Sequence, residues 1–153
     1  MKLASKAKTL EDLDKIIKNA KVLPLVRFFA CDYLNKKNEI LKKILDSFDS
    51  NLIVRSSSSS EDNLLTSNAG GFDSVLDVDI NSIDQIDDAI QTVIGSYGNT
   101  LQNEDEVFLQ PMLNKVIMSG VVFTADLDTL SSYYIINYDE SASTDSVTSG
   151  TSN

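Results

Sequence analysis

The chain has 153 residues, of which 42% are hydrophobic, and this is the size and composition of one globular domain with its own core. Its net charge of -10 disfavours nucleic acid and anionic membranes as general partners, because a phosphate backbone binds to a basic surface. The complete absence of histidine excludes Ser-His-Asp, Cys-His and histidine-zinc sites within this chain.

The first predicted element is a helix within residues 9–20, where leucine and isoleucine recur with the spacing of one helical face. Thr9 and Asp12 are placed as a capping pair at its start. Residues 22–24 end in proline, which pushes the preceding residue out of the helical conformation. A short extended piece is therefore expected after the helix.

A second amphipathic helix is predicted for residues 30–48, with a break near Asn35 and with its lysines on a solvated face. Leu34 is expected among the apolar residues that face the core. Residues 52–54 are short and apolar, which indicates a buried strand, and Arg55 is expected at the end of that strand.

Residues 56–71 are predicted to form a serine-rich loop. In residues 72–80 apolar and acidic side chains alternate, which is typical of a strand with one face toward water. Ser82 and Gln85 then match a capping box, and the apolar spacing of residues 83–97 predicts a third helix.

Three more strands are predicted, at residues 107–112, 116–124 and 133–138. Residues 114–115 are interpreted as the turn of a hairpin between the first two. Residues 139–153 contain almost no apolar side chains, so the chain is expected to be a piece of a longer protein.

Residues 44–153 contain eighteen Asp or Glu and two cations, Arg55 and Lys115. An arginine at a strand end can donate two hydrogen bonds to an anion with several oxygens, and phosphate is the natural candidate. The usual phosphate loops, GxxxxGK[ST] and GxGxxG, are absent. The alternative is an ion pair between this arginine and Glu61, Asp62 or another carboxylate, and the residues alone leave both interpretations open.

The chain has one cysteine, Cys31, so it can form no intrachain disulfide. It has no run of about 18 apolar residues that would span a membrane, and no apolar stretch typical of a signal sequence. We therefore expect a cytoplasmic protein without membrane or nucleic-acid partners.

Five segments, in order, resemble the nucleotide-binding domain shared by pyruvate phosphate dikinase and phosphoenolpyruvate synthase. Residues 52–78, LIVRSSSSSEDNLLTSNAGGFDSVLDV, resemble the family signature VRSS...ED...S.AG....L.V. The other segments are KAKTLEDL at 6–13, VFLQPM at 107–112, SGVVFTADLDT at 119–129 and DSVTSG at 145–150. The resemblance covers nearly the whole chain.

The resemblance implies an α+β fold, namely a partial ATP-grasp domain with a mainly antiparallel sheet flanked by helices. Residues 1–153 would be the N-terminal part of one such domain, of the PEP/pyruvate-binding type. A subdomain hinge would lie near residues 107–114.

The resemblance also implies a set of ATP-binding residues: Lys6, Arg55, Ser67, Ala69, Gly70 and Gln110. The lysine and the arginine would contact the phosphates, residues 67–70 would close over them, and the glutamine would lie near the adenine. The ordinary structural roles of these residues are an exposed lysine, a turn at Gly70 and a polar strand end at Gln110. The chain departs from the family at Leu127, where a proline is usual. It also has residues 143–145 where GLGE is usual, so Asp145 is a possible nucleotide contact in place of the glutamate.

Family members transfer a phosphoryl group from ATP, with Mg²⁺, through a phosphohistidine to an acceptor, and they release AMP and phosphate. The magnesium carboxylates and the histidine lie beyond the part that this chain matches. No catalytic residue and no metal ligand is therefore expected in this fragment, which alone should be inactive. The phosphohistidine and acceptor domains would lie elsewhere in the full-length protein.

The acceptor is not visible in the sequence. Relatives use pyruvate, glucans, antibiotics or, in capsule biosynthesis, the glutamine side-chain amide. The alternative function is a non-catalytic nucleotide-binding or protein-interaction module that retains the fold.

Overall fold

The computed structural model describes residues 4–58, 62–63, 66–67, 73–126 and 128–140, and for 62–63 and 66–67 it describes the backbone alone. The chain divides into two compact units, Met1–Met112 and Leu113–Asn153, which are described separately below. The fold is mixed α+β with antiparallel sheets, in agreement with the predicted class.

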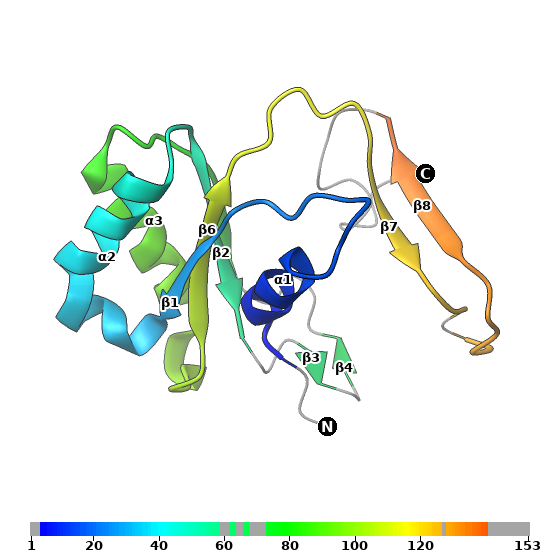
Figure 1. Cartoon of the computed structure of the whole chain (residues 1–153). Helices are drawn as coiled ribbons and strands as arrows, with labels where there is room; N and C mark the ends of the chain where they lie inside the picture. Colours follow the sequence, from blue (N-terminus) through cyan, green and yellow to red (C-terminus); the bar gives the residue numbers. More distant parts are fainter. Residues whose placement is uncertain (1–3, 59–61, 64–65, 68–72, 127, 141–153) are drawn as a thin grey trace. The chain divides into compact units, whose positions relative to one another are not determined.

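Unit 1 is built on a four-stranded antiparallel sheet (Figure 1). In sheet order its strands are β1 (Val26–Phe29), β6 (Glu106–Pro111), β2 (Leu52–Ser57) and β5 (Ser74–Val78). Every residue of β6 before Pro111 is buried. Both faces of this central strand are therefore covered, which explains the uninterrupted apolar run at residues 107–109.

Two helices, α2 (Tyr33–Ser47) and α3 (Ile83–Ser96), cover one face of this sheet (Figure 1). Ile44 and Ile90 are completely buried there against strand residues such as Val54 and Leu109. Burying an isoleucine or leucine stabilises a fold by roughly 1.5–3 kcal/mol, so this layer is a main source of stability. No helix within the described ranges is long and apolar enough to cross a membrane.

The first helix, α1 (Lys6–Asp14), begins earlier than the predicted start at Thr9. Its N-cap is Ser5, whose Oγ accepts a hydrogen bond from the backbone N–H of Lys8 at 3.3 Å. The predicted Thr9–Asp12 capping pair is wrong, because both residues lie inside the helix. The residues of the predicted extended piece, 22–24, lie in neither a helix nor a strand, and the strand that follows at Val26 was not predicted.

The predicted break near Asn35 is confirmed in α2. Lys36 has φ -122° and ψ 19°, which interrupts the helical backbone. The prediction for Leu34 is wrong, because its side chain is 84% exposed. The break changes the direction in which the first turn points, so residues before it leave the apolar face that Ile40 and Ile44 follow. A short 3-10 turn, η1 (Ala30–Asp32), precedes this helix.

Strand β5 departs from the predicted alternation. Leu52 pairs with Val78 and Val54 pairs with Val75, so β5 has one residue more than β2 over this stretch. Asp77 adopts φ 55°, as expected at a β-bulge. The bulge turns Val75 and Val78 toward the core and leaves Leu76, which lies between them in β5, 43% exposed. The predicted alternation had placed Leu76 on the same face as Val78.

The predicted start of the third helix is confirmed, since Ser82 Oγ accepts a hydrogen bond from the N–H of Gln85 at 3.3 Å. The helix ends at Ser96, and a 3-10 turn, η2 (Gly98–Thr100), follows. Within this helix Asp87 links to α2: it accepts hydrogen bonds from the hydroxyl of Tyr33 at 2.8 Å and from Lys37 Nζ at 2.6 Å.

Asp87→Ala is expected to lower the free energy of unfolding by about 1–3 kcal/mol, because it leaves the buried Tyr33 hydroxyl without this acceptor. The measurement is urea denaturation followed by circular dichroism. The control is Asp88→Ala, an exposed neighbour in the same helix, which should change stability by less than about 0.5 kcal/mol.

The contribution of Asp87 also depends on pH. Burial raises the pKa of its carboxyl, but the hydrogen bonds from Lys37 and Tyr33 outweigh burial, and the net direction is downward. A carboxyl whose pKa is lowered in the folded state stabilises the fold above its unfolded pKa of about 3.9 and loses this contribution as the pH falls. The stability difference between the wild type and Asp87→Ala should therefore shrink as the pH is lowered from about 6 to about 3. A difference that stays constant over this range would contradict the assignment.

Unit 2 contains two antiparallel strands, β7 (Ser119–Phe123) and β8 (Ile135–Asp139), which pair with each other. The predicted hairpin between the strands on either side of residues 114–115 is wrong, since β6 pairs with β1 and β2 instead. In the sequence, the boundary between the two units falls between Met112 and Leu113, within the region 107–114, but the hinge itself stays a prediction.

Candidate functional site

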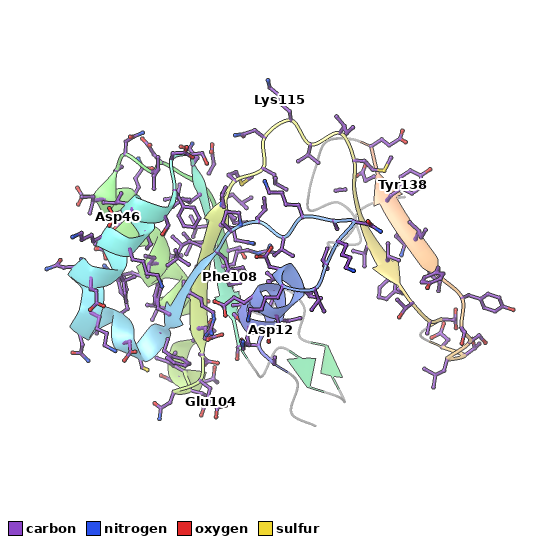
Figure 2. The ribbon with its side chains drawn as sticks, viewed as in Figure 1. Asp12, Asp46, Glu104, Phe108, Lys115 and Tyr138 are labelled. Atoms are coloured by element: carbon purple, nitrogen blue, oxygen red, sulfur yellow. The ribbon has the colours of Figure 1, made fainter. Side chains whose placement is uncertain are left out.

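The candidate site lies on the face of the unit 1 sheet opposite α2 and α3. In the register of the four strands, Arg27 pairs with Phe108, Phe108 with Arg55, and Arg55 with Ser74. Residues directly opposite each other in antiparallel strands point to the same face. Two arginines therefore flank one buried phenylalanine, which Figure 2 labels on β6.

Arg55 lies in the middle of this row. Its Cζ is 5.9 Å from the centre of the Phe108 ring, which is within the range of a cation–π interaction. Its Nε is buried and has no hydrogen-bond partner among the described residues. None of the carboxylates whose side chains are described forms an ion pair with it. Glu61 and the side chain of Asp62, the two predicted alternatives, lie outside the described residues.

Arg27 is different, because two carboxylates neutralise it. Its Nε lies 3.0 Å from Glu11 Oε2 on α1, and its Nη1 donates to Glu106 Oε1 on β6. Burial lowers the pKa of Arg27, but the combined effect of the two carboxylates raises it by more, so the net direction is upward. Of the two arginines in the row, Arg55 is thus the one whose charge is available to a ligand.

The predicted serine-rich loop begins later than expected, because β2 continues through Ser57. Ser56, Ser57 and Ser58 are all buried. Ser57 Oγ accepts a hydrogen bond from the N–H of Ala7 at 3.0 Å, and Ser58 Oγ donates to Asp105 Oδ1 at 2.6 Å. These three serines contribute to the packing of the sheet, while the remaining two of the run lie outside the described residues.

Lys6 lies in the first turn of α1 and is partly buried. The helix rests on the same face as Arg55, because Ala7 bonds to Ser57, which is two residues further along β2. Lys6 and Arg55 are therefore both placed on this face.

Gln110 lies on the same face, two residues beyond Phe108 in β6. It is 6% exposed, and its Nε2 donates a hydrogen bond to the backbone oxygen of Leu23 at 3.2 Å. The structure thus brings Arg55, Gln110 and the helix of Lys6 to one side of the sheet. Gln110 is therefore more than a polar residue at a strand end, because its side chain is buried and forms a hydrogen bond.

The remaining predicted contacts are not described. Ser67 is seen only as backbone in β4 (Thr66–Ser67), which pairs with β3 (Asp62–Asn63). Ala69, Gly70 and Asp145 lie outside the described residues. In the part of the chain that is described, no group of three Cys, Asp or Glu side chains is arranged to hold a metal ion.

Two residues of the site were not predicted from the sequence, Phe108 and Glu106. Both alternate with Gln110 along β6, so the period of two could have placed the three on one face. The apolar neighbours Val107 and Leu109 hid this pattern, because the strand is buried on both sides.

A pocket of about 360 Å³ lies beside β1, the edge strand, between α1 and α2. Its lining includes Glu11, Arg27, Phe29, Lys36 and Lys43. None of Lys6, Arg55 and Gln110 lines it, and its lining contains both basic and acidic side chains. It reaches the face of the candidate site through Arg27 and Glu11, which pair with each other at the edge of the sheet.

The arrangement suits a polyanion that also carries a hydrogen-bonding group: it has one arginine with available charge, a lysine-bearing helix on the same face, and a buried amide further along the same strands. Comparisons with protein-family models, with curated proteins and with solved structures find no match to this chain.

Proposed function

We propose that this chain is the ATP-binding portion of a multidomain ATP-dependent dikinase that resembles phosphoenolpyruvate synthase, with an ATP-grasp fold. The observation that carries the proposal is the position and available charge of Arg55. It belongs to the segment most similar to the family signature, and no described carboxylate neutralises it. It also shares one face of the sheet with Gln110 and with the helix of Lys6.

Arg55 is suited to hold the phosphates of ATP. Its guanidinium stays charged at any physiological pH, and its planar fork can donate two parallel hydrogen bonds to phosphate oxygens. Its backbone is in the sheet and its guanidinium lies over Phe108, so the donors are held before the ligand arrives. A donor that needs no reorganisation stabilises the charge that develops during phosphoryl transfer.

Lys6 supplies a second positive charge for the phosphates in this proposal, and Gln110 contacts the adenine. Because Gln110 Nε2 donates to the carbonyl of Leu23, its side-chain oxygen is the atom that would accept a hydrogen bond from the adenine amino group. Ser67, Ala69 and Gly70 would close over the phosphates, and Asp145 would contact the nucleotide.

The other functions belong to other parts of the full-length protein in this proposal. ATP is bound with Mg²⁺, whose ligands lie outside this chain, and a histidine in another domain accepts the phosphoryl group. AMP and phosphate are released, and an acceptor domain passes the phosphoryl group to a small molecule such as pyruvate or the glutamine side-chain amide. The protein would work in the cytoplasm, where ATP is available.

The test is incubation of the full-length protein with ATP, Mg²⁺ and candidate acceptors, followed by separation of the nucleotides. We expect AMP and inorganic phosphate, and a phosphorylated protein that is stable in base and labile in acid when the acceptor is omitted. Formation of ADP as the final nucleotide product would contradict a dikinase. Nucleotide binding without any turnover would instead favour the non-catalytic module.

A further inference from the structure

We propose that Glu106 is a positioning residue that holds α1, and with it Lys6, against the nucleotide-binding face. The inference rests on the proposed function, because it assigns a task to residues around the same site. Glu106 begins β6, is 3% exposed, and lies opposite Ser57 in the register of β2.

One carboxylate connects the helix start and the sheet. Glu106 Oε2 accepts a hydrogen bond from Ser5 Oγ, and Glu106 Oε1 accepts one from Arg27 Nη1. Ser5 is the N-cap of α1, and the same hydroxyl oxygen accepts from the N–H of Lys8 at 3.3 Å. The beginning of the helix is therefore tied to a side chain that is 101 residues away in sequence.

Two further contacts hold the helix. Arg27, which is bound to Glu106, also pairs with Glu11 in the second turn of α1 at 3.0 Å. Ala7 is completely buried, and its N–H donates to Ser57 Oγ at 3.0 Å. Lys6 thus lies between two anchored residues, Ser5 and Ala7, and its backbone position follows from theirs.

Attaching a helix through a buried carboxylate carries a cost in free energy. Removing a charge from water costs several kcal/mol, and replacing a buried ion pair by apolar side chains of similar volume is often neutral or stabilising. An apolar contact would fix the distance of α1 from the sheet but not its rotation or its register. The bonds from Ser5 and Arg27 to Glu106 specify both, and they thereby fix the backbone position from which the side chain of Lys6 extends.

The test is a double-mutant cycle in the full-length protein, with ATP affinity measured by isothermal titration calorimetry. Glu106→Gln preserves the shape and removes the charge that holds Arg27. We expect it to weaken ATP binding about tenfold in the wild-type background and less than about twofold in the Lys6→Ala background. Equal losses in the two backgrounds would overturn the inference, as would an unchanged affinity of the single variant.

The matched control is Asp105→Asn, which changes the buried carboxylate next to Glu106. Asp105 bonds to Ser58 and to the N–H of Gln102, and neither residue belongs to α1. Any loss that this variant causes should be the same with and without Lys6. A loss that disappears in the Lys6→Ala background would show that the coupling reflects general damage to the strand, and would overturn the inference.

Ser5→Ala provides a second variant if Glu106→Gln does not fold. It removes one attachment of α1 and retains the pair of Arg27 with Glu106. We expect a loss of about threefold in ATP affinity that again depends on Lys6, and an additive loss would count against the inference. If Lys6→Ala and Arg55→Ala both leave ATP binding unchanged, the proposed function fails and the inference fails with it. If both variants weaken binding while the losses from Glu106→Gln and Lys6→Ala simply add, the inference alone fails.

Discussion

Arg55→Ala in the full-length protein is expected to lower ATP-dependent AMP formation by about 10²–10³-fold, the usual effect of removing one preorganised donor to a developing charge. Among the residues of the face, Arg55 is the arginine whose charge the described carboxylates leave available. The substitution removes a partly buried cation from above Phe108, and the core on the other face of the sheet is untouched. The circular dichroism spectrum should therefore stay that of the wild type.

Two controls separate the role of the arginine fork from that of charge alone. Arg55→Lys keeps the charge and loses the planar pair of donors, so its activity should fall between those of the wild type and Arg55→Ala. Lys115→Ala removes the other cation of residues 44–153 and should leave AMP formation unchanged. Normal AMP production by Arg55→Ala would sink the assignment of this residue to the phosphates.

Ile90→Ala is expected to lower the free energy of unfolding by about 2–5 kcal/mol, the usual effect of truncating a large side chain in a packed core. Ile90 is completely buried in α3, where it belongs to the same cluster as Val54 and Leu109. The loss combines the transfer free energy of the missing carbons with the cavity that the rigid sheet cannot fill. The measurement is chemical denaturation with an unchanged slope against denaturant concentration.

Ile83→Ala is the matched control, since it makes the same substitution in the same helix. Ile83 is the first residue of α3 and is 50% exposed, so its truncation should cost less than about 1 kcal/mol. Equal losses for the two variants would mean that α3 does not pack on the sheet through the face described above.

Much of the fold was predictable because its signals are local. Ser82 and Gln85 lie three residues apart, and the cap they form needs nothing from elsewhere in the chain. The break at Lys36 in α2 and the buried strand that contains Val54 are likewise properties of a few neighbouring residues. The α+β class and the antiparallel arrangement also agree with the prediction.

Two of the errors come from contacts between residues that are distant in sequence. The helix α1 begins after Ser5, not at Thr9, and the Ser5 hydroxyl donates a hydrogen bond to Glu106, which is 101 residues away in sequence. The hairpin predicted at residues 114–115 does not form, because β6 lies between β1 and β2, where it gains partners on both edges. Neither competing contact is visible in a local pattern.

For the site, the amino-acid sequence by itself singled out Arg55, Lys6 and Gln110, because an arginine after an apolar run in an acidic region, and the family resemblance, are both properties of residue order. Only the tertiary structure decided that all three belong to one side of the sheet and that Arg27 is neutralised while Arg55 is not. The physical reason is register. Which residues of β1, β6 and β2 stand opposite each other depends on pairings between strands that are far apart in the chain, and shifting one strand by a single residue would have moved Arg55 to the opposite face.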